Sequence, residues 1–274
     1  MPIIAITREM GSLGKDVAVG LGQSLDLPVC YHEVVEPLAD RMRVRKSHVT
    51  SLIDGSAGLL ERLTADKTSL AIFSADEIFE LALQGQGAVV RGWGATHLLR
   101  DVRHAICVRV CAPLGLRKRR MMERLNTKDD TAVSVEIHCN DEAHTAIMRR
   151  NFGLQWTDPE NYDVVFNTER VSVEECVDEV IRLAKSDAFA ETPKSRQQLE
   201  DLALAARVRA ALRISAKTRN TKIAVTAKQG QVTLAGELGT DTLLAVAEVV
   251  DSVPGGANFK YQSHAPRAAE ARPN

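Results

Sequence analysis

"IIAITREMGSLGKDVAVGL", residues 3–21, joins three elements whose order decides the fold. Residues 3–7 are apolar and mostly β-branched, which predicts a buried strand. After a turn that contains glycines, apolar residues recur every four positions, at Val17, Leu21 and Leu25, as on the buried face of a helix. The stretch therefore predicts a strand, a glycine-rich loop and a helix.

A loop of this kind binds phosphate because its amides and the first amides of the helix point at one spot, where the helix dipole is positive. The usual phosphate loop reads G-x-x-x-x-G-K-[ST]. Gly14 and Lys15 match it, whereas Glu9 stands at the first glycine and Asp16 at the hydroxyl position. We expect Lys15 to neutralise phosphate oxygens. Asp16 either approaches a metal ion or repels phosphate, and a plain turn with a solvated lysine is the alternative.

Composition excludes several classes of function. The chain has 274 residues, of which 45% are apolar and 26% charged, as expected for a globular protein with a buried core. The formal net charge of -1 provides no basic field for nucleic acid or an anionic membrane. No run approaches the ~20 apolar residues that span a bilayer, and no signal peptide is visible. We expect a cytoplasmic protein that binds no nucleic acid and spans no membrane.

The cysteines favour a reducing cytosol with free, buried thiols, because they are odd in number and show no paired-thiol spacing. They are Cys30, Cys107, Cys111, Cys139 and Cys176. His138, Cys139, Asp141 and His144 lie close together in the sequence, but their spacing fits no standard zinc site. We predict no metal site built from protein side chains alone.

Strands and helices alternate over residues 1–185. The predicted strands are 3–7, 88–90, 105–111 and 162–166, and the predicted helices are 15–25, 32–45, 58–84, 116–125 and 173–183. Strands that are apolar along their whole length and are separated by helices indicate a parallel sheet covered on both faces. The first domain is therefore predicted as α/β, a P-loop parallel sheet covered by helices.

The pattern changes after residue 185. Residues 186–198 are polar and contain a proline, which indicates a linker. An alanine-rich helix, two alternating strands around residues 228–230, a second helix and a short third strand follow. This α-β-β-α-β order predicts a small α+β domain with an antiparallel sheet over residues 199–263. Residues 264–274 are rich in Ala, Arg and Pro and are expected to be disordered.

The segment "LRKRRMMERL", residues 116–125, is a strongly basic helix. Arg117, Arg120 and Arg124 are spaced i, i+3 and i+7 and share one face. Arginine forks stabilise the negative charge that phosphoryl transfer spreads over oxygens, so Arg117 and Arg120 are candidate catalytic residues beside Lys15. The alternative is a solvated helix face. Its ion-pair partners would be Glu123, Asp129 and Asp130.

Residues 1–185 resemble cytidylate kinase-like proteins, a branch of the P-loop nucleoside monophosphate kinases. The resemblance runs through the S/T-R-E-x-G-S-x-G pattern of the loop and continues in "GAVVRGWGATHLLRDVRHAICVRVCAPLGLRKRRMMERL" and "DEAHTAIMRRNFGLQWTDPENYDVVFNT". It implies a five-stranded parallel sheet, ATP with Mg²⁺, and transfer of the γ-phosphoryl group to a pyrimidine monophosphate such as CMP. The basic segment would begin a lid over ATP. The implied nucleotide-binding residues are Gly11, Ser12, Gly14, Lys15, Asp16 and Arg119.

The chain departs from the pattern of that family on the acceptor side. In the family's Gly-Arg-Gly motif, Trp93 takes the place of the arginine. In its Asp-x-x-Arg motif, His144 takes the place of the arginine, and its Tyr-Asp pair reads Tyr31-His32. Trp93 can stack on a base but cannot pair with a phosphate. We expect Trp93, His144 and Arg149 to contact the substrate, with a plain surface histidine as the alternative for His144. A catalytically impaired nucleotide sensor and an interaction protein without nucleotide are the rival functions.

The C-terminal domain resembles a BON domain, a small α+β module. The family's G-x-V-x-L-x-G strand pattern is present as residues 230–236, and the step before its last strand is only approximated by residues 253–256. The resemblance implies a module without catalytic residues that binds a protein or phospholipid surface. A passive interaction or dimerisation domain is the alternative.

Overall fold

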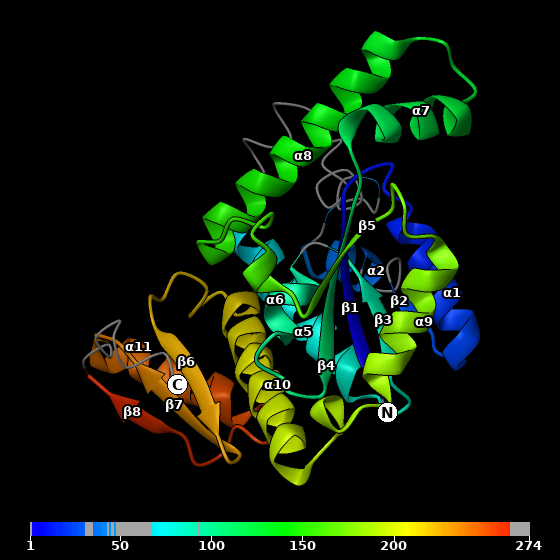
Figure 1. Ribbon diagram of the computed structural model, residues 1–274. Coiled ribbons are helices and arrows are strands. Elements are labelled where there is room, and N and C mark those ends of the chain that lie inside the picture. Colours follow the sequence, from blue (N-terminus) through cyan, green and yellow to red (C-terminus); the bar gives the residue numbers. More distant parts are fainter. Residues whose placement is uncertain are drawn as a thin grey trace. The chain divides into compact units, whose positions relative to one another are not determined.

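The computed structural model describes residues 2–30, 35–42, 44, 47, 67–92 and 94–263 (Figure 1). The described chain forms two compact units. The first contains the described residues up to Lys67 together with Gln84–Thr192, and the second contains Thr68–Leu83 together with the described residues from Pro193 onward. Trp93, Tyr31-His32, the beginning of the helix predicted at 58–84 and the tail 264–274 lie outside the described residues.

The first unit is built on a parallel sheet of five strands in the order β2-β3-β1-β4-β5, so the prediction of an α/β fold is confirmed. Ile4 and Ile6 of the central strand are fully buried, because both faces of the sheet are covered. The short strand β2 was not predicted from the residues. The strands are β1 (Ile3–Arg8), β2 (Val29–Cys30), β3 (Ala88–Arg91), β4 (Ala105–Cys111) and β5 (Val164–Asn167).

Helices cover the sheet as an amphipathic pattern requires (Figure 1). The first helix buries Val17 and Leu21, as its spacing predicts, against Val177 and Val180 of the helix that follows the last strand. A capping box between Ser172 and Glu175 begins that later helix. The helices are α1 (Gly14–Leu25), α2 (Val35–Met42), α6 (Ala95–Leu99), α7 (Leu114–Leu125), α8 (Asp130–Phe152) and α9 (Val173–Ala184), with short 3₁₀ turns at Pro159–Asn161 and Asp187–Phe189.

The second unit contains a three-stranded sheet in the order β6-β7-β8 with helices. The predicted hairpin is present, since β6 and β7 are antiparallel, but β8 pairs parallel to β7. The expectation of a purely antiparallel sheet is therefore wrong, because the helix between β7 and β8 is a crossover that returns the chain in the same direction. The elements are α5 (Lys67–Leu83), α10 (Pro193–Ile214), β6 (Ala224–Lys228), β7 (Gln231–Ala235), α11 (Thr240–Asp251) and β8 (Lys260–Gln262).

Helix α5 belongs to this second unit, although its sequence lies inside the first predicted domain. It runs antiparallel to α10, since Arg213 Nε donates to Ser69 Oγ at 2.7 Å near one end and Arg196 Nη2 to Leu83 O at 3.3 Å near the other. Helix α10 begins at Pro193, so residues 193–198 are helical where the sequence predicted a linker. Proline suits the first turn of a helix because its missing N–H would have no intrahelical partner there.

Of the helices that the structure describes, none combines the length and apolar character needed to cross a bilayer.

We expect Ile6→Ala to lower the free energy of unfolding of the first unit by about 2–5 kcal/mol, because it leaves a cavity in the central strand. Urea unfolding followed by tryptophan fluorescence measures this change, because both tryptophans, Trp93 and Trp156, lie in the sequence range of the first unit. Val19→Ala is the matched control, because Val19 is 39% exposed. Its effect should stay within about 0.5 kcal/mol. Equal losses in both variants would contradict this account of the core.

Candidate functional site

The loop between β1 and α1 requires glycine at two positions. Gly11 has φ +80°, and a Cβ on it would stand 2.7 Å from the carbonyl oxygen of Arg117 in α7. A Cβ on Gly14 would stand 2.6 Å from Cβ of Arg8. Leu13, with φ 64°, adopts the left-handed region without being glycine. The loop is therefore tightly folded, and it lies in direct backbone contact with the basic helix.

The carbonyl oxygens of this loop are held by the protein itself. Each of the five carbonyls from position 9 to position 13 accepts at least one hydrogen bond. The donors are Ser12 N (3.1 Å) and Oγ (2.8 Å) to Glu9 O, Arg117 Nη1 to Met10 O (3.4 Å), Arg120 Nη1 to Gly11 O (3.5 Å), Thr168 Oγ1 to Ser12 O (2.8 Å), and Asp16 N and Val17 N to Leu13 O (3.0 Å each).

The amides that follow are available to a ligand. The N–H groups of Leu13, Gly14 and Lys15 donate to no acceptor within the described ranges. These amides lie at the leading end of α1, where the helix dipole favours a negative charge. The side chains of Lys15 and Asp16 are exposed and have no partner among the residues that the structure describes. The amides of Leu13, Gly14 and Lys15, with the lysine side chain beside them, have the geometry and charge that suit an anion.

Ser12 holds the loop through its side chain. Its side chain is fully buried, and its hydroxyl lies within donating distance of Glu9 O (2.8 Å) and Val110 O (2.9 Å). The hydroxyl has one proton, so it donates to one of these carbonyls at a time. We infer that Ser12 anchors the loop to β4 and does not direct its hydroxyl at the ligand.

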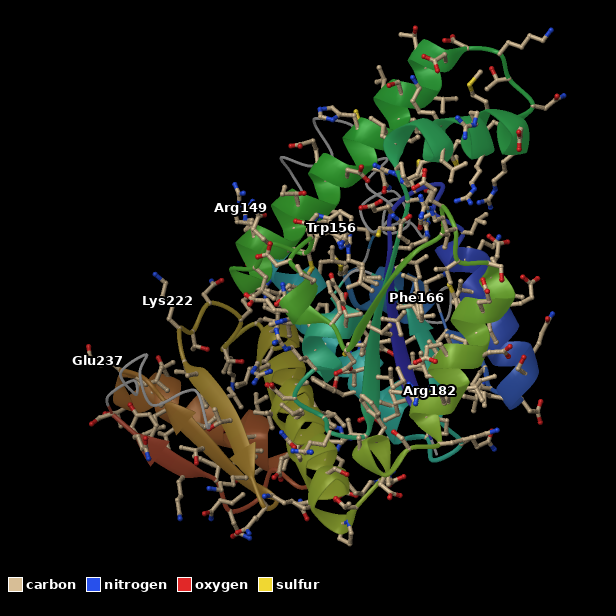
Figure 2. All side chains as sticks on the ribbon, in the orientation of Figure 1. Arg149, Trp156, Phe166, Arg182, Lys222 and Glu237 are labelled. Atoms are coloured by element: carbon tan, nitrogen blue, oxygen red, sulfur yellow. The ribbon has the colours of Figure 1, made fainter. Side chains whose placement is uncertain are left out.

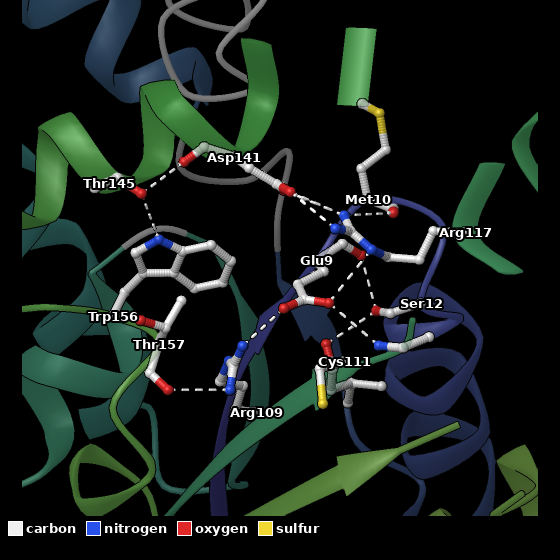
Figure 3. Close-up of polar contacts among 12 residues, drawn as sticks. Glu9, Met10, Ser12, Arg109, Cys111, Arg117, Asp141, Thr145, Trp156 and Thr157 are labelled. Carbon is white, nitrogen blue, oxygen red and sulfur yellow. Dashed lines mark hydrogen bonds and ion pairs between the residues drawn. The ribbon is translucent and has the colours of Figure 1, made fainter. Parts of the chain in front are cut away.

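The structure places Arg117 and Arg120 of α7 beside the loop, and both are bonded to other protein groups. Figure 3 shows the bonds of Arg117 to Met10 and Asp141. Arg117 is buried and forms an ion pair with Asp141 of α8 at 3.0 Å. Burial raises the pKa of Asp141, although the charge of Arg117 lowers it. Arg120 is half-buried, and among the described residues it donates to neutral acceptors alone: Thr168 Oγ1 (3.0 Å), Thr168 O (2.7 Å) and the loop carbonyl. No carboxylate of the described residues therefore pairs with Arg120, and its positive charge lies at the loop.

Arg119 is not brought to the loop. It follows Arg117 by two positions, which is about 200° around a helix. Its exposed side chain lines a surface depression at the end of α7. The other lining residues are Met122, Glu123, Asn126, Thr127 and Lys128. The ion pair expected of a solvated face is present at Lys118, which contacts Asp130 at 2.7 Å.

His144 lies in the interior, so the alternative of a plain surface histidine is wrong. Its ring stacks on Trp156 with centroids 3.9 Å apart, and the Trp156 indole donates to Thr145 Oγ1 at 2.9 Å (Figure 3). Burial, together with the charges of Arg8 and Arg109, lowers the pKa of His144 to about 3. The imidazole is therefore neutral at physiological pH, and its contact with substrate stays a prediction.

Arg149 lies apart from the loop, in the last turn of α8 (Figure 2). Its side chain is exposed, and its guanidinium is 3.4 Å from Gln155 Oε1. The third residue expected on the acceptor side, Trp93, lies outside the described residues. The structure therefore brings Gly11, Ser12, Gly14, Lys15 and Asp16 together with Arg117 and Arg120 and leaves Arg119 and Arg149 elsewhere.

Sequence reasoning missed four residues that shape this site, namely Glu9, Arg109, Asp141 and Thr168. In the sequence, Glu9 stands out only as a mismatch at the first glycine of the phosphate-loop pattern. Arg109 is the one signal that the sequence offered, because a charged residue inside the apolar strand "AICVRVC" needs a buried partner. Its guanidinium is 2.7 Å from Glu9 and 5.3 Å from the centre of the Trp156 ring.

Comparisons with known proteins agree with this fold. Residues 3–170 match the sequence pattern of the Cytidylate kinase-like family. A crystal structure of an uncharacterized protein from Eubacterium ventriosum ATCC 27560 superposes with a TM-score of 0.53 and 21% identity, over 68% of this chain and 99% of that chain. At this identity the likeness shows the fold alone. No curated protein matches this chain.

We expect His144 to make the protein sensitive to acid. Its pKa is lowered from 6.5 to about 3 in the folded protein, so between these values the unfolded chain binds more protons. Stability therefore falls as the pH is lowered through this range. Urea unfolding at pH 7 and pH 5 should show a smaller difference for His144→Phe than for the wild type. His138→Gln, on the exposed side of α8, should keep the wild-type difference, and an unchanged slope in His144→Phe would refute the prediction.

Proposed function

This chain belongs to the Cytidylate kinase-like family, and we propose that it is an ATP-dependent kinase that phosphorylates a nucleoside monophosphate. One observation carries the proposal: the amides of Leu13, Gly14 and Lys15 have no acceptor among the described residues, whereas the loop carbonyls before them are all bonded. Such amides at a helix N-terminus bind phosphate groups. The proposed ligand is the triphosphate of ATP.

The exposed ammonium group of Lys15 would lie against the β- and γ-phosphate oxygens. Magnesium is held in such sites by one or two carboxylates together with substrate phosphates, and the exposed carboxylate of Asp16 fits that role. In the described part of the chain no three His, Cys, Asp or Glu side chains gather as a metal site, which suits an ion that arrives with the nucleotide. When bound, the ion neutralises charge between the β- and γ-phosphates.

Arg120 is the proposed catalytic arginine. Its bonds go to neutral acceptors, so its positive charge remains for the transferring phosphoryl group, and the 3.5 Å bond to Gly11 O is weak. Arg117 was expected to share this role, but two carboxylates already neutralise it. Exchange of Arg117 from these carboxylates to a phosphate would leave Asp141 without its arginine partner and Glu9 with Arg109 alone. We therefore assign the direct contact to Arg120.

The acceptor is proposed to be a pyrimidine monophosphate such as CMP. This part of the proposal rests on the family alone. Trp93 remains the candidate for stacking on the base. His144, neutral and buried, would act on the acceptor only through Trp156 or after rearrangement. Arg149 is free of carboxylate partners among the described residues and remains a candidate for the acceptor phosphate.

For residues 199–263 we propose a BON-like module that binds a protein or phospholipid surface. The G-x-V-x-L-x-G pattern coincides with the turn and strand of the β6–β7 hairpin. Val232 and Leu234 are buried while Thr233 is half-buried on the other face, which is the alternation that the pattern requires. We also propose a cytosolic location, since the five cysteines are free thiols.

The test of the function has two stages. Thermal stabilisation by Mg·ATP is measured first, and phosphoryl transfer to CMP, dCMP and UMP second. The kinase requires both. Stabilisation without transfer to any acceptor would indicate a nucleotide sensor, and the absence of both would indicate an interaction protein.

We expect Lys15→Ala to abolish the thermal shift by Mg·ATP and to lower kcat/KM by about 10²-fold or more, because a preorganised positive charge on the phosphates is lost. Lys185→Ala is the matched control, since Lys185 is also exposed but follows α9. The control should retain the wild-type shift. A full shift in Lys15→Ala would place the nucleotide elsewhere.

We expect Asp16→Asn to weaken binding of Mg·ATP about tenfold, or ~1.4 kcal/mol, because a charged ligand of the ion is lost. Isothermal titration calorimetry with ATP, once in excess Mg²⁺ and once in EDTA, separates an effect on the bound metal from an effect on ATP itself. Affinity for metal-free ATP should not fall, since a carboxylate near the phosphates is removed. Equal weakening under both conditions would show that Asp16 does not act through the metal.

A further inference from the structure

Glu9 occupies the position at which a phosphate loop usually has its first glycine, and its carboxylate is almost fully enclosed. The side chain is 13% exposed. Oε1 accepts from Arg109 Nη2 at 2.7 Å, and Oε2 accepts from the amide of Ala112 at 3.2 Å and pairs with Arg117 Nε at 3.4 Å (Figure 3). A buried carboxylate with a complete set of partners is a built feature, because an unpaired one would be strongly destabilising.

Arg117 is held from two directions. Its terminal nitrogens donate to Asp141 at 3.0 Å, and its Nε faces Glu9. With Arg109 these groups form a cluster of two guanidinium and two carboxylate groups, which is neutral as a whole. Arg117 therefore brings no net charge to the loop, unlike Arg120, and its bond to Met10 O acts on the backbone.

The loop backbone and α7 meet where Glu9 holds Arg117. The backbone of Gly11 lies so close to Arg117 that a Cβ would stand 3.0 Å from Arg117 Cα. Arg117 donates to Met10 O, and Arg120, one turn later, donates to Gly11 O. A shift of Arg117 would thus move the carbonyls of Met10 and Gly11 and with them the orientation of the amides that follow.

We propose that Glu9 is a positioning residue of the phosphate loop, which acts through Arg117 to fix the loop backbone against α7 so that the following amides meet a nucleoside triphosphate. This inference rests on the proposed function. It assigns Arg117 to the support of the loop and leaves the contact with phosphate to Lys15, Arg120 and the amides. Glu9 touches neither substrate nor metal in this account.

The first experiment is a double-mutant cycle on the affinity for Mg·ATP. Glu9→Gln keeps the shape of the side chain and removes its charge, and Arg117→Met removes its partner. Each single variant should raise the Kd of Mg·ATP about tenfold, which corresponds to ~1.4 kcal/mol. Since both substitutions remove the same contact between Glu9 and Arg117, the double variant should bind Mg·ATP no more weakly than Arg117→Met alone. Additive losses, about a hundredfold in the double variant, would overturn the inference.

The second experiment measures the loop without ligand. Amide hydrogen exchange at positions 11–16 should be faster in Glu9→Gln than in the wild type, because the backbone has lost its support. Glu142→Gln is the matched control, since Glu142 is exposed on α8 directly after Asp141. It should change neither the exchange nor the affinity. A general loss of structure would instead accelerate exchange in β1 and β4 as well.

The two experiments separate the inference from the proposed function. If the wild type binds Mg·ATP and Glu9→Gln changes neither affinity nor loop exchange, the inference is wrong and the kinase proposal stands. If the wild type does not bind Mg·ATP, the kinase proposal fails, and loop exchange alone decides whether Glu9 supports the loop. If Glu9→Gln does not fold, Glu9→Asp replaces it. Glu9→Asp keeps the negative charge on a shorter side chain. If amide exchange in the loop of this variant equals that of the wild type, the inference is overturned.

Discussion

The hydrogen bonds to the loop carbonyls between Glu9 and Leu13 are the constraint on which the site depends. A peptide unit is planar, so a carbonyl that is held also fixes the amide of the next residue. The carbonyls of Glu9 and Leu13 are held by Ser12 and by the first turn of α1, whereas those of Met10, Gly11 and Ser12 are held by α7 and by Thr168 after β5. The conformation of the loop therefore depends on distant elements of the first unit as well as on the eight residues of the loop motif, 9–16.

Ion pairing divides the basic helix into residues with different roles. Carboxylates compensate the charges of Arg117 and Lys118, whereas Arg120 has neutral oxygens as its acceptors among the described residues. Arg119 lines a depression away from the loop. A run of like charges thus contains one arginine paired with two carboxylates, one surface ion pair and, among the described residues, one arginine bonded to neutral oxygens. Their partners come from α8, the loop and the segment after β5, so the roles are assigned by tertiary contacts.

The strand, loop and helix at residues 3–21 were predictable because apolar periodicity and glycine placement are local signals. The parallel sheet followed from alternation of apolar strands with helices, although the two-residue β2 was too short to leave a pattern. The surroundings of Arg117 were not predictable, because Glu9 and Asp141 are distant in sequence and are brought together only by folding. His144 was misjudged as a possible surface group for the same reason, since Trp156 buries it from a later segment.

The position of helix α5 in the sequence limits where the chain can be divided. The helix lies inside the stretch that carries the family pattern, yet its bonded neighbour is α10, beyond the end of that stretch. A gene cut after residue 170 would leave α5 without this companion. Only residues 84–87 separate α5 from β3. The second unit therefore takes one of its helices from inside the stretch that carries the family pattern, and a foreign module in place of residues 193–263 would require redesign of α5.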